Sequence, residues 1–121
     1  STYGRMDIKE LQNKVIEFRD KRDWGQYHNS KDLAVSISLE AAELLEIFQW
    51  KDAGQVEGMK TDETARKRVK EELGDILIYA LTLAHEFGFD PTDVILGKMQ
   101  VNDEKYPVEK VKGRSDKYTA Y

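Results

Sequence analysis

Residues 30–50 are the segment that most restricts how this chain can fold. Apolar side chains recur in the segment at helical spacing and occupy nearly every side of a helical wheel. They are Leu33, Ala34, Val35, Ile37, Leu39, Ala41, Ala42, Leu44, Leu45, Ile47 and Phe48. A helix that is apolar all round is buried on more than one face. The rest of the molecule, or a second copy of it, must therefore surround this helix.

Three further segments have helical periodicity, over residues 7–23, 61–87 and 91–105. Both prolines, Pro91 and Pro107, lie at the edges of these segments, so no proline interrupts a helix. Ser30 and Asp90 are suitable N-caps, and Gly88 is a suitable end for the third helix. Residues 24–29 and 51–60 are expected to be loops. Because no strand pattern or internal repeat is present, the sequence predicts an all-α fold of four helices. Such a short chain cannot readily cover its apolar second helix, which favours a homo-oligomer.

Composition excludes several functional classes. The 23 acidic residues exceed the 19 basic ones, giving a net charge of −4, which disfavours binding to nucleic-acid phosphates. The lack of cysteine excludes disulfides, thiolate zinc sites and thiol nucleophiles. No apolar run has membrane length, so no membrane partner is predicted and a cytoplasmic location is expected. We expect one domain over residues 6–106, preceded by a non-native or disordered leader (1–5) and followed by a polar tail (107–121).

Two acidic residues stand out on the apolar second helix. Glu40 lies within the stripe formed by Leu33, Ile37 and Leu44, and Glu43 follows three residues later on the same side. A carboxylate in an apolar stripe is costly unless it is paired or bound to a metal. The ordinary alternative is a helix-edge glutamate paired with Lys or Arg.

The third helix repeats this spacing with Glu72 and Asp75, and Tyr79 follows. Residues three apart on a helix point the same way, so antiparallel packing of the two helices would bring four carboxylates together. Four such anions need cations, and a donor set of oxygen atoms alone suits Mg²⁺, with Mn²⁺ as the alternative. No histidine stands three residues after these acids, which argues against a ferritin-like di-iron site. Mg²⁺ held in this way usually takes further ligands from substrate phosphates, which suggests phosphoanhydride hydrolysis.

The order and spacing of four sequence blocks resemble the MazG-like nucleoside triphosphate pyrophosphohydrolases, and most closely their small dCTP-pyrophosphatase branch. The blocks are residues 23–28 (DWGQYH), 40–51 (EAAELLEIFQWK), 71–79 (EELGDILIY) and 102–107 (NDEKYP). The similarity spans residues 8–107. It implies a four-helix bundle that packs into a homo-oligomer, either a dimer or a tetramer. It also implies Mg²⁺-dependent cleavage of an NTP or dNTP between the α and β phosphates.

The resemblance also assigns roles to individual residues. The metal ligands and catalytic acids would be Glu40, Glu43, Glu72 and Asp75, which would activate a water; one of them, or Glu46, would accept its proton. The substrate-binding residues would be Trp24 and Trp50 at the base, with Tyr79, Lys98, Asn102 and Lys105 near the phosphates. Packing at helix ends or exposure to solvent is the alternative for these six residues. Val15 and Glu86 stand where eukaryotic relatives carry histidine and arginine, which leaves the preferred base open.

Two other classes of function are compatible with the sequence. The first is a non-catalytic helical module that binds a nucleotide or a protein. The second is a structural oligomer whose acids are paired in salt bridges. Retention of all four acids favours the enzyme.

Overall fold

A computed structural model describes residues 4–27 and 29–111 of the chain, and within these ranges the protein is helical without strands. Four long helices dominate: α1 (Ile8–Lys21), α2 (Ser30–Phe48), α4 (Glu63–Glu86) and α5 (Pro91–Lys105). Short helices lie between and after them: the 3₁₀ helix η1 (Trp24–Tyr27), α3 (Ala53–Met59) and α6 (Val108–Val111). The all-α prediction is therefore confirmed. None of the described helices is both long enough and apolar enough to cross a membrane.

Local sequence signals account for most helix ends. Asp7 caps α1 by accepting a hydrogen bond from the Glu10 N–H, and Asp90 caps α5 just before Pro91. Gly88 follows α4 with φ of 69°, the left-handed conformation that glycine adopts most easily. The cap of α2 is Asn29 rather than Ser30, because the Asn29 side chain reaches the Asp32 N–H.

Helix α3 lies in a segment predicted to be a loop. A capping box starts it: Asp52 accepts from the Gln55 N–H, and the Gln55 side chain accepts from the Asp52 N–H. Its two glycines, Gly54 and Gly58, masked this signal. Residues 24–27, also predicted to be a loop, form one short 3₁₀ turn. In the predicted tail, residues 108–111 form α6, and residues 112–121 lie outside the described part.

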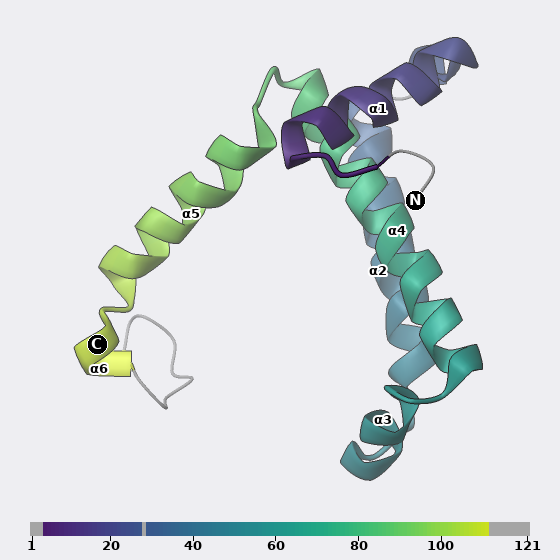
Figure 1. The fold of residues 1–121 in the computed structure, drawn as a ribbon, viewed down its shortest axis with the longest axis vertical. Helices are drawn as coiled ribbons and strands as arrows, with labels where there is room; N and C mark the ends of the chain where they lie inside the picture. Colours follow the sequence, from purple (N-terminus) through teal and green to yellow (C-terminus); the bar gives the residue numbers. More distant parts are fainter. Residues whose placement is uncertain (1–3, 28, 112–121) are drawn as a thin grey trace.

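The centre of the molecule is a pair of neighbouring helices, α2 and α4, which lie side by side along their length (Figure 1). Helix α1 packs across the C-terminal half of α4, and α3 contacts α4 at the opposite end of the pair. This arrangement places the third-helix acids opposite the second-helix acids.

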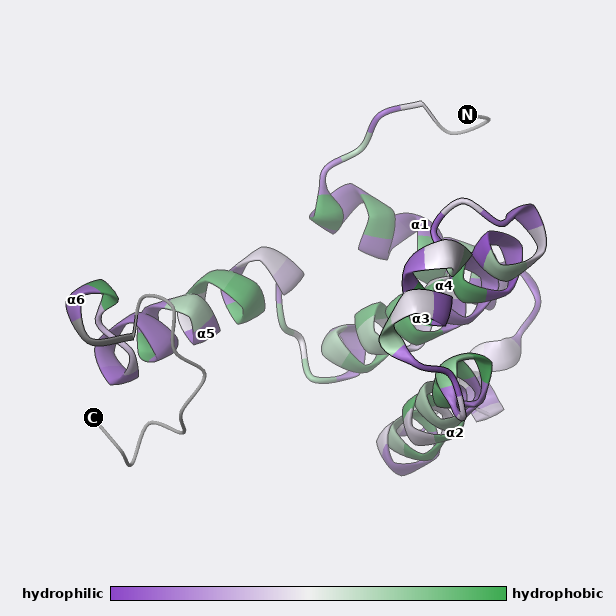
Figure 2. Cartoon of the chain, turned by 90° about the horizontal axis from the view of Figure 1, so that it is seen from below, coloured by the Kyte–Doolittle hydropathy of each residue, from purple (hydrophilic) through white to green (hydrophobic). Residues whose placement is uncertain are grey.

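Helix α5 projects away from the α2–α4 pair, and its main contact is with α1 (Figures 1 and 2). Apart from Pro91 its described residues are exposed, including the apolar side chains of Val94, Ile95, Leu96, Met99 and Val101. Within one chain, therefore, three of the four long helices pack together and the fourth stands apart.

The apolar surface that the chain buries by itself is small. In the described part, the buried apolar side chains are those of Ile16, Leu33, Ile47 and Met59. On α2, Val35, Leu39 and Leu45 remain 48–62% exposed, as expected for a helix that one chain cannot cover.

Candidate active site

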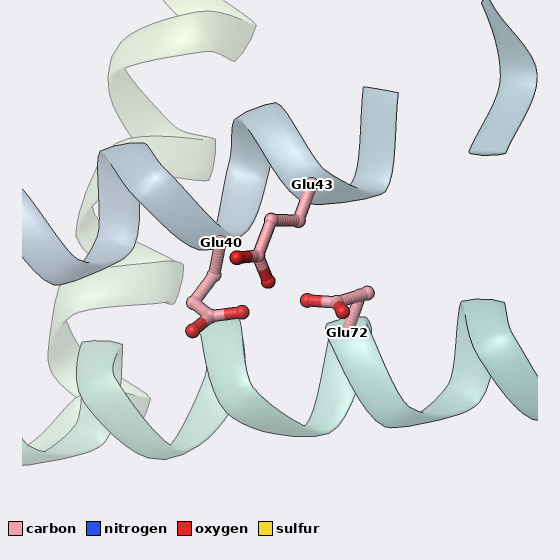
Figure 3. Close-up of side chains that lie close together, drawn as sticks. All are labelled: Glu40, Glu43 and Glu72. Atoms are coloured by element: carbon pink, nitrogen blue, oxygen red, sulfur yellow. The ribbon is translucent and has the colours of Figure 1, made fainter. Parts of the chain in front are cut away.

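Three of the four predicted acids meet between α2 and α4. Glu40 and Glu43 point from α2 toward α4, and Glu72 points back from α4 (Figure 3). One carboxylate oxygen from each lies within 4.8 Å of the other two. Glu40 and Glu72 are half-buried and Glu43 is exposed. The site is thus open to solvent on one side and closed by helix packing on the other.

The three carboxylates lack compensating charge from the protein. In the described part of the chain, no Lys or Arg forms an ion pair with Glu40, Glu43 or Glu72. Oε2 of Glu40 and Oε2 of Glu72 are buried and receive no hydrogen bond as carboxylates. An unsatisfied buried oxygen costs free energy, so this cluster needs either a proton or a cation.

The pKa of Glu40 reports the same conflict. It is raised from 4.5 to about 7, first because protonated Glu40 can hydrogen bond to Glu72, and then through burial and the neighbouring Glu43. A carboxyl that holds its proton near neutral pH in the absence of metal exchanges that proton for a cation when one binds. The donor set consists only of oxygens, which fits a hard divalent cation.

Asp75 lies outside this three-residue cluster. It is one turn further along α4, exposed, and it lines a neighbouring cavity of about 560 Å³ between α1 and α4. The cavity is walled mainly by apolar side chains: Met6, Leu11, Val15, Phe18, Trp24, Ile78 and Tyr79, together with Lys14, Arg19, Asp75 and Thr82. Its size falls within the range of small-molecule pockets. An apolar pocket thus adjoins the carboxylate cluster.

Leu11, Val15 and Phe18, apolar residues at helical spacing on α1, line this cavity. Leu11 and Phe18 are 44% and 46% exposed, whereas Gln12, Ile16 and Arg19 make up the buried face of the helix. Helix α4 instead contacts the adjacent, more polar face of α1 through Gln12 and Arg19. The most apolar face of α1 is therefore part of the cavity wall.

Two predicted base-pocket residues do not lie together within one chain. Trp24 is on the cavity wall, with its ring edge-on to Phe18 at a centroid distance of 5.9 Å. Trp50 stands just after α2, near the α3 end of the α2–α4 pair, and its side chain is 91% exposed. Trp50 has φ of 70°, an uncommon conformation for a bulky residue, and such strain is found preferentially at functional sites.

The predicted phosphate-contacting residues divide in the same way. Tyr79 lies on α4 at the cavity wall. Lys98, Asn102 and Lys105 lie along α5, which projects away from α2 and α4 (Figure 1). The cations proposed to neutralise phosphate are therefore separated from the carboxylates of the same chain.

Arg19 is a cavity residue that the sequence did not single out. Its side chain is 11% exposed; Nη1 donates to Glu86 Oε1 at 2.5 Å and Nε donates to Asp20 Oδ1 at 3.1 Å. Glu86, which stands where eukaryotic relatives are expected to carry arginine, thus forms an ion pair with the buried Arg19 of α1. The only sequence signal for this pair was that departure at Glu86.

Known proteins are similar to this chain in sequence, and one solved structure is similar to it in fold. The chain is 34% identical over 112 residues to human dCTP pyrophosphatase 1 and 35% identical to the bovine protein of that name, covering 93% of this chain. It spans 66% of the length of each of these relatives. The crystal structure of a pyrophosphatase from Archaeoglobus fulgidus superposes with a TM-score of 0.73 at 44% identity, covering 85% of this chain and 94% of that one.

The family assignment agrees with the acidic spacing and the helical architecture. Residues 35–120, most of the chain, match the MazG-like family. This match includes most of α2 and all of α4, the two helices that carry the carboxylate cluster. The chain therefore belongs to the MazG-like family.

Proposed function

We propose that this chain is a Mg²⁺-dependent nucleoside triphosphate pyrophosphohydrolase. The observation that carries the proposal is the approach of Glu40, Glu43 and Glu72 within 4.8 Å, without a cationic side chain paired to them in the described part. The names of the relatives agree with this activity, since they are pyrophosphatases. The substrate would be an NTP or dNTP, with dCTP or a modified dNTP tested first, and the products a nucleoside monophosphate and pyrophosphate.

Glu40, Glu43 and Glu72 would hold the metal, with Asp75 as a proposed fourth ligand. Mg²⁺, or Mn²⁺ in its place, would neutralise phosphate charge and lower the pKa of a water molecule. The buried Oε2 atoms of Glu40 and Glu72 fit this role because no group of the protein donates a hydrogen bond to them.

The acids also supply a proton acceptor for the hydrolysis. The water oxygen forms a bond to the α-phosphorus, and the bond from that phosphorus to the oxygen bridging the α and β phosphates breaks. The bridging oxygen leaves with the outer two phosphates as pyrophosphate. A carboxylate of the cluster, or Glu46 three residues beyond Glu43 on α2, accepts the proton that the water loses.

The cavity beside Asp75 is the proposed base pocket. Its apolar walls exclude water from the flat faces of a base, and Trp24 offers an aromatic ring for stacking. Tyr79 lies on the cavity wall one turn beyond Asp75, where we expect it to contact the phosphates.

A second copy of the chain would complete the site. Trp50 and the α5 residues Lys98, Asn102 and Lys105 lie away from the cavity of their own chain, whereas the apolar surfaces of α2 and α5 are uncovered. We therefore propose a dimer or tetramer in which these residues serve the site of a neighbouring copy.

Product analysis on a panel of normal and modified NTPs and dNTPs tests the activity. With Mg²⁺ the wild type should release pyrophosphate rather than orthophosphate, and EDTA should abolish the release. Glu40→Gln and Glu72→Gln should each lower kcat at least about 100-fold, in line with the loss of a principal electrostatic group. Glu71→Gln is the matched control, because Glu71 is exposed on α4 beside Lys67 and outside the cluster.

Two results would count against the proposal. Unchanged turnover in Glu40→Gln would reject the assigned site. Tight dNTP binding without turnover in either Mg²⁺ or Mn²⁺ would instead identify a non-catalytic nucleotide-binding module.

A further inference from the structure

A single stripe of α4 carries, in order, a basic residue, the acids and the base-pocket wall. Arg68, Glu72, Asp75 and Tyr79 are spaced by four, three and four residues, so they lie on one face of the helix. The facing stripe of α2 runs through Glu40, Glu43 and Ile47 and ends with Lys51 just beyond the helix. Both stripes thus pass from acidic to basic toward α3.

A second cavity lies at that basic end. It has a volume of about 430 Å³ and is lined by α4, α3 and the end of α2. The buried side chains of Ile47 and Met59 line it, and Lys51, Arg68 and Thr64 offer hydrogen-bond donors. Four residues of helix cover about 6 Å, so Arg68 begins one turn away from Glu72.

The two basic side chains of this cavity are not occupied by protein partners. Within residues 4–27 and 29–111, neither Lys51 nor Arg68 makes a side-chain hydrogen bond or an ion pair. The one acid in the lining, Asp62, accepts a hydrogen bond from the Ala65 N–H as the N-cap of α4. The donors at this end therefore have no protein anion paired with them.

We propose that this second cavity, built on Lys51 and Arg68, is a diphosphate subsite that holds the outer two phosphates of the substrate and then the released pyrophosphate. The base pocket, the acids and this cavity follow one another along α4 in the order base, inner phosphate and outer phosphates. The guanidinium of Arg68 can donate two hydrogen bonds to one phosphate group, and Lys51 adds a point charge. Arg68 lies about 10 Å of helix from Asp75 at the edge of the base pocket, so we expect the outer phosphates of a triphosphate, rather than the single phosphate of a monophosphate, to reach this end.

The subsite rests on the proposed function, but inorganic pyrophosphate tests it without turnover. Titration calorimetry of the full chain in Mg²⁺ measures pyrophosphate and dCMP binding separately. The Lys51→Gln/Arg68→Gln double variant should bind pyrophosphate at least about tenfold more weakly while its affinity for dCMP changes less than about twofold. The single variant Arg68→Lys should bind pyrophosphate more tightly than the double variant does, because it keeps the positive charge at position 68.

Lys67→Gln is the matched control, since Lys67 is the neighbouring cation on α4 but faces Glu71 and is absent from this cavity. Both tested side chains are exposed, so circular dichroism should show an unchanged fold. The subsite is refuted if the double variant binds pyrophosphate as tightly as Lys67→Gln does, or if dCMP binding weakens equally. A wild type that binds pyrophosphate here but hydrolyses no nucleotide would refute the function and retain the subsite.

Discussion

Glu40 links the packing of two helices to the protonation of the site. It meets Glu72 across the α2–α4 contact and Glu43 along its own helix, and its pKa is raised to about 7. A folded-state pKa above the unfolded value means that the folded protein binds protons more tightly than the unfolded chain does. The stabilisation from that proton is complete below the unfolded pKa and is lost as pH rises through the folded pKa.

The metal-free protein should therefore lose thermal stability as pH rises from 4.5 to about 7. Calorimetric melting in EDTA across this range measures the loss. Glu40→Gln should flatten the slope, because the amide cannot ionise, and Mg²⁺ should raise the melting temperature most at the alkaline end. An equally steep slope in Glu40→Gln would show that another group is responsible.

The Arg19–Glu86 pair makes a second prediction at the scale of single residues. Removing the carboxylate in Glu86→Ala leaves a guanidinium that is 11% exposed without its shortest hydrogen bond. The variant should lose about 1–3 kcal/mol in the free energy of unfolding, measured with urea.

Glu71→Ala is the comparison for that variant. Its partner Lys67 is 4.0 Å away and 79% exposed, so the change should stay within about 0.5 kcal/mol. Equal losses in the two variants would show that burial of Arg19 does not strengthen its pair.

At the scale of elements, Gln12 fixes the angle between α1 and the end of α4. It is fully buried, and its Nε2 donates to the carbonyl oxygens of Leu81 and Phe89, both at 3.2 Å. One side chain thus joins α1, the last turns of α4 and the connection to α5.

Gln12→Ala should destabilise the protein by about 1–3 kcal/mol, because two carbonyl groups lose their donor. Hydrogen exchange should locate the loosening at residues 81–89. Gln26→Ala should have little effect, since Gln26 is exposed and bonds only within its own turn, to Asp23. Exchange that rises uniformly along the chain would contradict a local joint.

The helices and the acidic spacing could be predicted because both depend on local sequence. Periodicity placed α5 at its observed bounds, and the repeat of Glu40–Glu43 in Glu72–Asp75 indicated a shared site. Three of those acids do meet, whereas Asp75 lies one turn beyond the cluster. The three-residue spacing predicts the face of α4 on which Asp75 lies. It does not predict which side chains of the facing helix α2 stand opposite Asp75.

Tertiary contacts account for what local patterns missed. The buried face of α1 is polar because Gln12 and Arg19 find partners 67 to 77 residues away. Periodicity cannot reveal which stripe of a helix a distant partner covers. Helix α3 was not predicted for a different reason: Gly54 and Gly58 are typical of a connection, although Asp52 and Gln55 form a capping box in the structure.

At the scale of the whole molecule, the exposed apolar surface is large for a chain that buries so little. Leu39 and Leu45 on α2, Leu77 on α4 and Leu96 on α5 are each 57–62% exposed. Exposed apolar surface of this extent marks an interface. The assembly proposed above would cover it.

Ile95→Asp should therefore lower the oligomeric state, because it places a charge on the apolar face of α5. Light scattering after size-exclusion chromatography measures the mass. Gln100→Asp, on the polar side of the same helix beside Glu104, should leave the mass unchanged. A monomeric wild type at micromolar concentration would contradict the assembly.

The outward course of α5 has a genetic consequence. If α5 contributes to the site of a neighbouring copy, a chain with a substituted acid still supplies an intact α5 to its neighbour. A chain with a substituted α5 still supplies intact acids. Glu72→Gln and Lys98→Gln proteins, inactive alone, would regain activity when refolded together. Two defective alleles could then complement one another within a single assembly, a property that a self-contained active site does not have.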